Sequence, residues 1–299
     1  MKDDTIYRLI KFFTRLIGWI PRPIARGISD FLGRIWFKAD KRHRLIVQEN
    51  ISHAFGLSMD DPGVRNMARE IFKNIAGILF EIGWAYNLKR SEFPRYFTFK
   101  GYENLEAALK KRKGALVLTC HLGNWELLCQ AVSQLGLENA ILYRKLDFQP
   151  LERFLLEIRE QFGTRLIALK GASRKVDALL ARGHIVGTLL DQNVDWHEGC
   201  FVNFFGRPAC TNDGVASLIL RTKAPVVPMF IVREGQKYLI EFLPEVPLVL
   251  TNDRIKDLEI NTQNYTSAIE TMIRRCPAQW FWVHNRWKTK NSCPWPKAA

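Results

Sequence analysis

His121 and Glu126 are the two residues of this 299-residue chain whose types and spacing best fit acid–base chemistry. They occur in the segment TCHLGNWE (119–126), which overlaps the end of the short apolar run ALVLTC (115–120). A run of this length after a glycine is typical of a buried strand, and a helical pattern follows it. Ligand sites in open α/β sheets gather at the carboxyl ends of strands, so His121 lies where a catalytic residue is expected.

Glu126 falls about one and a half turns into the expected helix, within reach of the imidazole. A carboxylate on one ring nitrogen fixes the tautomer and stabilises the imidazolium, so the pattern predicts a general-base dyad. The alternative is a capping histidine and a surface glutamate, which the loose HxxxxE spacing alone favours. Gly123 would let a substrate approach the backbone, and helix N–H groups nearby could hold an oxyanion.

No protein nucleophile accompanies this histidine. The chain has no GxSxG elbow, no HExxH, no GxxxxGK[ST] and no GxGxxG. Strand alternation points Cys120 away from the junction. None of the six cysteines forms a CxxC pair, which favours reduced, mostly buried thiols over a disulfide framework or a zinc site. A base without a protein nucleophile would activate a hydroxyl of the substrate itself.

Strands and helices alternate from about residue 96 onward. This alternation predicts an α/β fold with a mixed, largely parallel sheet flanked by helices. We expect a helical portion over residues 1–95 and an α/β domain over residues 96–299, joined as one continuous globular unit. The strand candidates are 96–101, 115–120, 139–144, 165–169, 184–190, 225–232 and 237–243. The helical patterns are 103–113, 121–136, 150–162, 173–182, 213–223 and 262–276.

The N-terminal helices are amphipathic and cationic. Residues 5–20 carry a narrow cationic stripe on an otherwise apolar helix, which suits a membrane interface; the alternative is a core helix with snorkelling cations. A second segment, through about Lys38, places four cations and one acid on one face. Residues 41–90 are also helical, with a break near 58–63 where Asp60 or Asp61 precedes Pro62 as an N-cap. No run of about 18 uncharged apolar residues predicts a membrane span.

The net charge of +14 points to an anionic partner. A hydrophobic content of 47% excludes a disordered chain. The first 50 residues hold 11 Lys and Arg against 5 Asp and Glu, interleaved with Phe, Trp and Ile, which favours anionic membrane lipids. Nucleic acid is a minor alternative, because no recognition helix, RNP box or zinc finger is visible.

Several segments together carry a family resemblance. HLGNWE (121–126) resembles the HxxxxE/D box of bacterial lipid A biosynthesis acyltransferases, the lauroyl/myristoyl transferase family related to glycerolipid acyltransferases. Other segments are similar to that family's blocks and follow its order. They are RHRLIVQENISHAFG (42–56), YRKLDFQPL (143–151), GTLLDQNVDWHEGCFVNFFGRPACT (187–211), APVVPMF (224–230) and CPAQWFWVHNRWKTK (276–290).

The resemblance implies an enzyme of the inner membrane's cytoplasmic face, peripheral or monotopic. It would move a fatty acyl chain from acyl carrier protein, or from acyl-CoA, to a hydroxyl of a phosphorylated glycolipid, with no metal and no further cofactor. A lipid A precursor is the expected acceptor, and another phospholipid, glycolipid or aminolipid is the alternative. The N-terminal helix is shorter and more cationic than some members' anchors.

The resemblance also implies roles for particular residues. His121 would be the general base and Glu126 its orienting carboxylate. Arg159 is the best match to the family's arginine after the YRxxxxxPL block, and Asp191 matches the acid of the DQ pair. The residues expected to contact substrate are Gly123, Asn124, Arg144, Arg159 and Asp191. For the arginines the alternative is a solvated charge, and for Asp191 a turn or cap. We expect His184, His197 and His284 to be structural.

Overall fold

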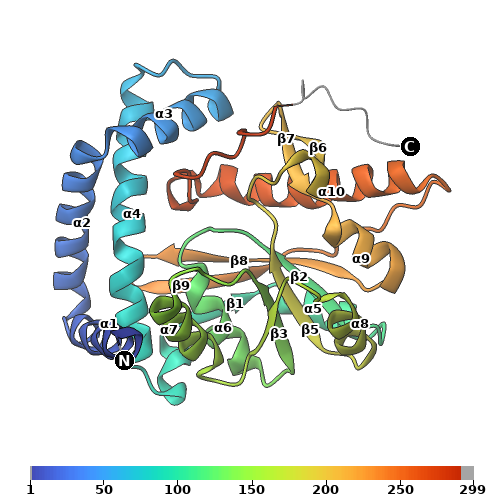
Figure 1. Ribbon diagram of the computed structural model, residues 1–299, viewed down its shortest axis with the longest axis horizontal. Helices are drawn as coiled ribbons and strands as arrows, with labels where there is room; N and C mark the ends of the chain where they lie inside the picture. Colours follow the sequence, from blue (N-terminus) through green and yellow to red (C-terminus); the bar gives the residue numbers. More distant parts are fainter. Residues whose placement is uncertain (1, 291–299) are drawn as a thin grey trace.

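The computed structural model describes residues 2–290, and its first four helices stand along one side of the molecule (Figure 1). They are α1 (Lys2–Gly18), α2 (Arg22–Ala39), α3 (Lys41–Phe55) and α4 (Pro62–Tyr86). Asp61 caps α4 by accepting from the backbone N of Gly63 at 2.6 Å, as the Asp-Pro pattern predicts. Gly56 ends α3 in a left-handed conformation.

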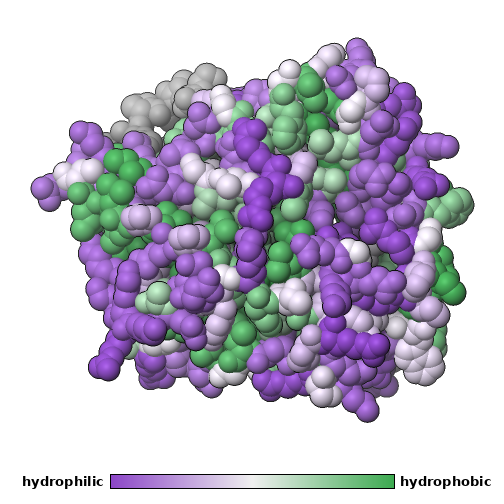
Figure 2. All heavy atoms as spheres, turned by 180° about the vertical axis from the view of Figure 1, so that it is seen from behind, coloured by the Kyte–Doolittle hydropathy of each residue, from purple (hydrophilic) through white to green (hydrophobic). Residues whose placement is uncertain are grey.

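Close backbone approach lets these helices pack. A Cβ on Gly33 of α2 would lie 2.5 Å from the Cα of Lys73 on α4, so only glycine fits there. Ala25, Ser29 and Phe37 continue the buried face of α2. Much of the remaining surface of α1 and α2 is exposed. Figure 2 shows apolar side chains along this edge of the molecule, and the large exposed ones are Leu9, Phe12, Phe13, Leu16, Trp19, Ile24, Ile28, Phe31, Leu32 and Ile35.

A seven-stranded sheet forms the centre of the molecule and confirms the predicted fold class. Its order is β1-β9-β8-β2-β5-β3-β4, and only β8 and β9 pair antiparallel. The strands are β1 (Phe97–Lys100), β2 (Ala115–Thr119), β3 (Asn139–Tyr143), β4 (Arg165–Ala168), β5 (Ile185–Leu189), β8 (Val226–Glu234) and β9 (Lys237–Phe242). A separate antiparallel hairpin of β6 (Gly199–Phe204) and β7 (Arg207–Asn212), which the sequence patterns did not predict, lies over α10.

The central strands are buried on both faces. In β2, Leu116 and Leu118 belong to one apolar cluster and Ala115 and Val117 to another, as the two-residue period of a strand requires. Both faces are covered, which explains the continuous apolar runs in the sequence. The remaining α-helices are α5 (Tyr102–Leu109), α6 (Leu128–Val132), α7 (Gln149–Glu160), α8 (Ser173–Ala181), α9 (Gly214–Thr222) and α10 (Arg254–Arg275). Helix α10 begins eight residues earlier than its pattern predicted.

Helix α7 is tied to the N-terminal helices through Glu157. This carboxylate accepts from Lys11 Nζ on α1 at 2.5 Å, from the Tyr7 hydroxyl on α1, and from the Tyr86 hydroxyl on α4 at 2.7 Å. Among the described residues, no helix is long and apolar enough to cross a membrane.

Candidate active site

His121 and Asp191 lie side by side at the carboxyl ends of two neighbouring parallel strands. Thr119 of β2 is in register with Leu189 of β5, and His121 and Asp191 each follow their strand by two positions. His121 Nδ1 lies 2.8 Å from Asp191 Oδ1, and the backbone N of His121 donates to Asp191 Oδ2 at 2.9 Å. The ionised carboxylate of Asp191 can only accept a hydrogen bond, so Nδ1 of the neutral ring carries the proton. Nε2 therefore keeps its lone pair.

Charge and burial act in opposite directions on this pair. Burial lowers the pKa of His121, but the attraction of Asp191 and its hydrogen bond outweigh burial and hold that pKa above the ordinary value. Burial alone would raise the pKa of Asp191, yet the His121 charge and hydrogen bonds hold it well below its usual range. Asp191, which is 1% exposed, is therefore ionised at neutral pH inside the protein.

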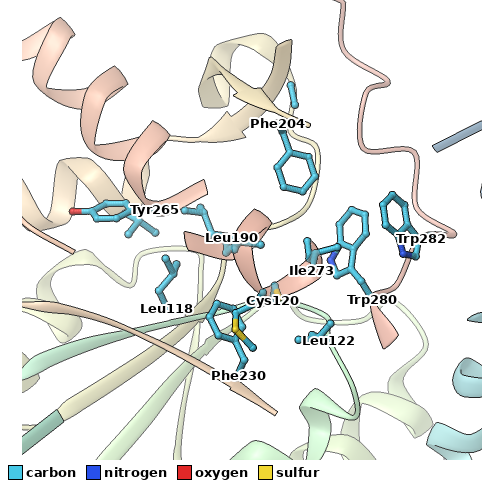
Figure 3. Packing of buried hydrophobic residues seen from close by; sticks show 14 of the residues in the cluster. Leu118, Cys120, Leu122, Leu190, Phe204, Phe230, Tyr265, Ile273, Trp280 and Trp282 are labelled. Atoms are coloured by element: carbon cyan, nitrogen blue, oxygen red, sulfur yellow. The ribbon is translucent and has the colours of Figure 1, made fainter. Parts of the chain in front are cut away.

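Trp280 makes the third hydrogen bond to the Asp191 carboxylate. Its Nε1 donates to Asp191 Oδ2 at 2.7 Å. Figure 3 shows the Trp280 indole packed between Phe204 and Trp282, with ring centroids 5.7 and 4.6 Å away. The indole is buried and closely packed, so its N–H is fixed in place against Asp191.

The segment that carries Trp280 is held from several sides. The backbone N of Phe281 donates to the carbonyl of His121 at 3.0 Å. Asn50 of α3 donates to the carbonyl of Trp282 at 2.9 Å. Arg286 is fully buried, and it donates to the carbonyl of Cys210 at 2.8 Å and to the Thr211 hydroxyl on β7. These bonds make residues 277–287 a wall of the site.

Glu126 has a different partner from the one that the sequence predicted. Its oxygens accept from Arg159 Nε and Nη2 of α7, each at 2.8 Å, and from Trp125 Nε1 at 3.1 Å. The attraction of Glu126 raises the pKa of Arg159 further, despite the opposing effect of burial. The dyad expected between His121 and Glu126 is therefore replaced by two pairs, His121–Asp191 and Glu126–Arg159.

The local backbone explains this correction. The segment after His121 does not continue as the helix that was expected over 121–136. A 3-10 turn runs over η2 (Trp125–Leu127), α6 follows, and a second 3-10 turn, η3 (Ser133–Leu135), ends at Gly136. A helical offset cannot place Glu126 when the residues between it and His121 are not helical.

The packing of the protein itself requires a glycine at position 123. Its φ is +62°, and a Cβ there would lie 2.3 Å from the carbonyl oxygen of Ile231 on β8. Its backbone N donates to the carbonyl of Gln279 at 3.0 Å, so this N–H is already used. The expected approach of substrate to Gly123 is replaced by the approach of β8 and residues 277–279.

Asn124 also faces the protein. It is fully buried, and its Nδ2 donates to Glu81 Oε2 of α4 at 2.9 Å. Glu81 in turn accepts from Arg233 of β8, with Nη2 at 2.8 Å from Oε2. The attraction of Glu81 offsets the burial of Arg233 and raises its pKa. A buried ion pair thus anchors the turn after His121, and the substrate contact expected of Asn124 is not available to its Nδ2.

Arg144 and His284 differ in their position relative to the pair. Arg144 follows β3 at the same end of the sheet and is exposed. His284 is half-buried and lies close enough to Asp191 to interact electrostatically, and removal of its ring from water lowers its pKa to about 4. The sequence patterns did not predict that Trp280 donates a hydrogen bond to Asp191. The only signal for it was the resemblance of segment 276–290 to a family block, because neither its type nor its spacing marks it.

A half-buried histidine on a buried carboxylate, at the strand ends of an α/β sheet, is the arrangement expected of an α/β enzyme. The family model described as "Bacterial lipid A biosynthesis acyltransferase" matches residues 4–289. The chain belongs to this family and is an acyltransferase.

Curated relatives agree with this assignment. The chain is 24% identical over 286 residues to a lipid A biosynthesis acyltransferase of Haemophilus influenzae, covering 93% of this chain and 86% of the relative. It is 24% identical over 281 residues to a lipid A biosynthesis lauroyltransferase of Escherichia coli, covering 92% and 89%. A phosphatidylinositol mannoside acyltransferase of Mycobacterium tuberculosis is 25% identical over 190 residues, covering 62% and 58%.

Proposed function

We propose that this protein transfers a fatty acyl chain from a thioester directly to a hydroxyl of a membrane glycolipid, with His121 as general base. The observation that carries the proposal is the His121–Asp191 pair, which leaves Nε2 as the basic nitrogen. Cys120 is fully buried, and burial raises the pKa of its thiol, which argues against a cysteine nucleophile beside the histidine.

The proposed reaction balances without a covalent enzyme intermediate. His121 Nε2 takes the proton of the acceptor hydroxyl as its oxygen forms a bond to the thioester carbonyl carbon. Asp191 stabilises the imidazolium through the Nδ1–H bond. The tetrahedral intermediate then collapses, the carbon–sulfur bond breaks, and the imidazolium returns the proton to the departing thiolate.

Arg159 is the proposed cation for a substrate oxyanion or phosphate. Two of its five N–H groups are bound to Glu126, so three remain, and its side chain is 16% exposed. Glu126 would fix the guanidinium so that these donors keep one direction. Arg144 is the second candidate for an acceptor phosphate, since it stands exposed at the same sheet edge. Asn124 and Gly123 would position the turn that carries His121.

We propose a lipid A precursor as acceptor and acyl carrier protein as donor. The support for this acceptor is the family description and the full-length relatives named for lipid A biosynthesis. A second acceptor class, glycosylated phosphatidylinositol, is favoured by the shorter matches to phosphatidylinositol mannoside acyltransferases. The protein would lie on the cytoplasmic face of the inner membrane, with the exposed apolar residues of α1 and α2 in the lipid interface.

A transfer assay tests the proposal. The purified protein in mixed micelles is given radiolabelled acyl carrier protein thioester with either a lipid A precursor or a phosphatidylinositol mannoside. We expect label in the lipid A precursor, and its loss in His121→Ala with vesicle binding intact. Full activity of His121→Ala would refute the general-base role, and label only in the mannoside would replace the acceptor.

A further inference from the structure

A cationic cleft lies between α2 and α4, away from the His121–Asp191 pair. It has a volume of about 410 Å³, and five cations from the two helices line it. They are Arg34, Lys38, Arg65, Arg69 and Lys73. Phe37 also lines it, and the guanidinium of Arg69 lies 5.7 Å from the centre of that ring.

The charges in this cleft are not balanced by the protein. Glu70 is the one acidic residue that lines it, and Glu70 is already paired with Lys73 at 2.5 Å. Within residues 2–290, the structure pairs no carboxylate with Arg34, Lys38, Arg65 or Arg69. Like charges gathered in this way repel one another, and a bound anion would remove that repulsion.

The position of two arginines adds to this cost. Arg65 lies in the first turns of α4, which begins at Pro62; Asp61 caps that helix, and its first turn contains no acidic residue. A helix N-terminus carries partial positive charge, so cations are unfavourable there and anions are favoured. Arg69 follows one turn later. These exposed cations at one end of α4 favour the binding of an anion.

The mouth of the cleft adjoins the apolar surface of α2. Phe31 and Ile35 are 61% and 47% exposed, and they lie three residues before Arg34 and Lys38, respectively. Residues three apart are neighbours on a helix surface, so each apolar side chain stands beside a cation of the cleft. An anion held in the cleft therefore has exposed apolar surface next to it.

We propose that this cleft binds the phosphate-bearing headgroup of one anionic membrane lipid, with its acyl chains beside the apolar face of α2. A guanidinium fork matches phosphate oxygens in a bidentate manner, and three of the five cations are arginines. The neighbouring apolar residues favour a lipid over an acidic protein as occupant. This proposal rests on the membrane location given above, but it concerns a site distinct from the acyl transfer site.

Vesicle binding tests the proposal without any acyl transfer. Phosphatidylcholine vesicles carry either phosphatidylglycerol or oleate, at matched zeta potential. We expect the natural protein to bind the phosphatidylglycerol vesicles at least about 5-fold more tightly, because oleate offers a carboxylate in place of a phosphate. Replacing Arg34, Arg65 and Arg69 by Gln should remove that preference and weaken binding at least about 10-fold.

Two matched variants make the test specific. Replacing Lys170, Arg174 and Lys175 by Gln removes three exposed cations near α8, on the opposite side of the molecule from α2 (Figure 1), and should leave both affinities within about 2-fold. Replacing the three cleft arginines by Lys keeps the charge and removes the forks. It should retain binding to oleate vesicles and lose the preference for phosphatidylglycerol, and it serves if the Gln variant does not fold.

Two results would contradict the headgroup site. Equal losses in the cleft and α8 variants would mean diffuse attraction and overturn the headgroup site. Unchanged vesicle binding with a raised KM for acyl carrier protein thioester would assign the cleft to the acidic protein and also overturn it. His121→Ala should bind vesicles as the natural protein does, so failure of the catalytic proposal leaves this result readable.

Discussion

The imidazole of His121 meets the carboxylate of Asp191 at 2.8 Å, although 70 residues separate them in the chain. The parallel pairing of β2 with β5 makes this contact, since it brings the residues after the two strands to one edge of the sheet. Glu126, the carboxylate that lies close to His121 in the sequence, is bound to Arg159 instead. His121 and Arg159 therefore have separate carboxylates, and substitutions at each pair should have separate effects.

Asp191→Asn should lower kcat by about 10²–10⁴-fold, because the imidazolium loses its counter-charge and the ring loses its fixed tautomer. It should also shift the acid limb of the pH–rate profile to lower pH. The pKa of His121 is raised by Asp191, and the base acts only when deprotonated. Asp195→Asn, at an exposed position in the same loop, is the control and should leave the profile unchanged. An unmoved acid limb in Asp191→Asn would contradict the pairing.

Glu126→Gln should lower activity without a comparable shift of that acid limb. Its carboxylate binds Arg159 and acts on His121 only through space. Breaking this pair leaves the guanidinium of Arg159, largely buried, without a carboxylate, which costs several kcal/mol when a charge is fully buried and less at this 16% exposure. The pH–rate profiles of Glu126→Gln and Asp191→Asn, measured together, show which carboxylate sets the pKa of His121. A shift as large as that of Asp191→Asn would restore the dyad that the spacing suggested.

The contribution of His121 to stability should depend on pH. Since its pKa is raised on folding, its stabilisation is fully present below the unfolded-state pKa and is lost as pH rises through the folded-state pKa. The ordinary pKa of a histidine in an unfolded chain is about 6.5. The difference in unfolding midpoint between the natural protein and His121→Gln should therefore be larger at about pH 5.5 than at about pH 9, which lie on either side of that value. Thermal denaturation in micelles measures it. A difference that grows with pH would reverse the sign and exclude the ion pair.

Gly123→Ala should destabilise the protein and abolish activity, because the added Cβ would lie 2.3 Å from the carbonyl oxygen of Ile231. Gly171→Ala is a close control. Gly171 also has a positive φ, +73°, but no atom lies within 4 Å of its added Cβ. The control should cost only about 1–2 kcal/mol, the strain of a left-handed residue. Equal losses in chemical denaturation would show that backbone strain, rather than contact with β8, is responsible.

Arg233→Met should cost about 3–5 kcal/mol, because Glu81 is then a buried charge without its partner. Adding Glu81→Gln should recover much of that loss in urea denaturation, since the uncompensated charge is gone. The single variant should also reduce kcat, because Glu81 anchors Asn124 in the turn after His121. A double variant as unstable as the single one would show that the ion pair itself is not the cause.

The sequence predicted the seven sheet strands and most helices because buried strands and amphipathic helices have local signatures. His121 was singled out from its place after the strand β2, and Asp191 from the family resemblance, as a residue expected to contact substrate. Their pairing was not predicted, since strand order is a long-range property that no local pattern encodes. The non-helical turn at Gly123 and Asn124 was interpreted as helix, and for that reason Glu126 was predicted to pair with His121. The β6–β7 hairpin was not predicted because apolar and polar residues do not alternate clearly in it.

The contact between Trp280 and Asp191 has a consequence for synthesis of the protein. The strands that carry His121 and Asp191 are complete by residue 191, but the donor that fixes Asp191 is translated almost ninety residues later. Both β2 and β5 are synthesised well before the indole and the surrounding wall of 277–287. The Asp191 carboxylate therefore acquires its full set of hydrogen bonds only after this late segment has been synthesised and has packed against it.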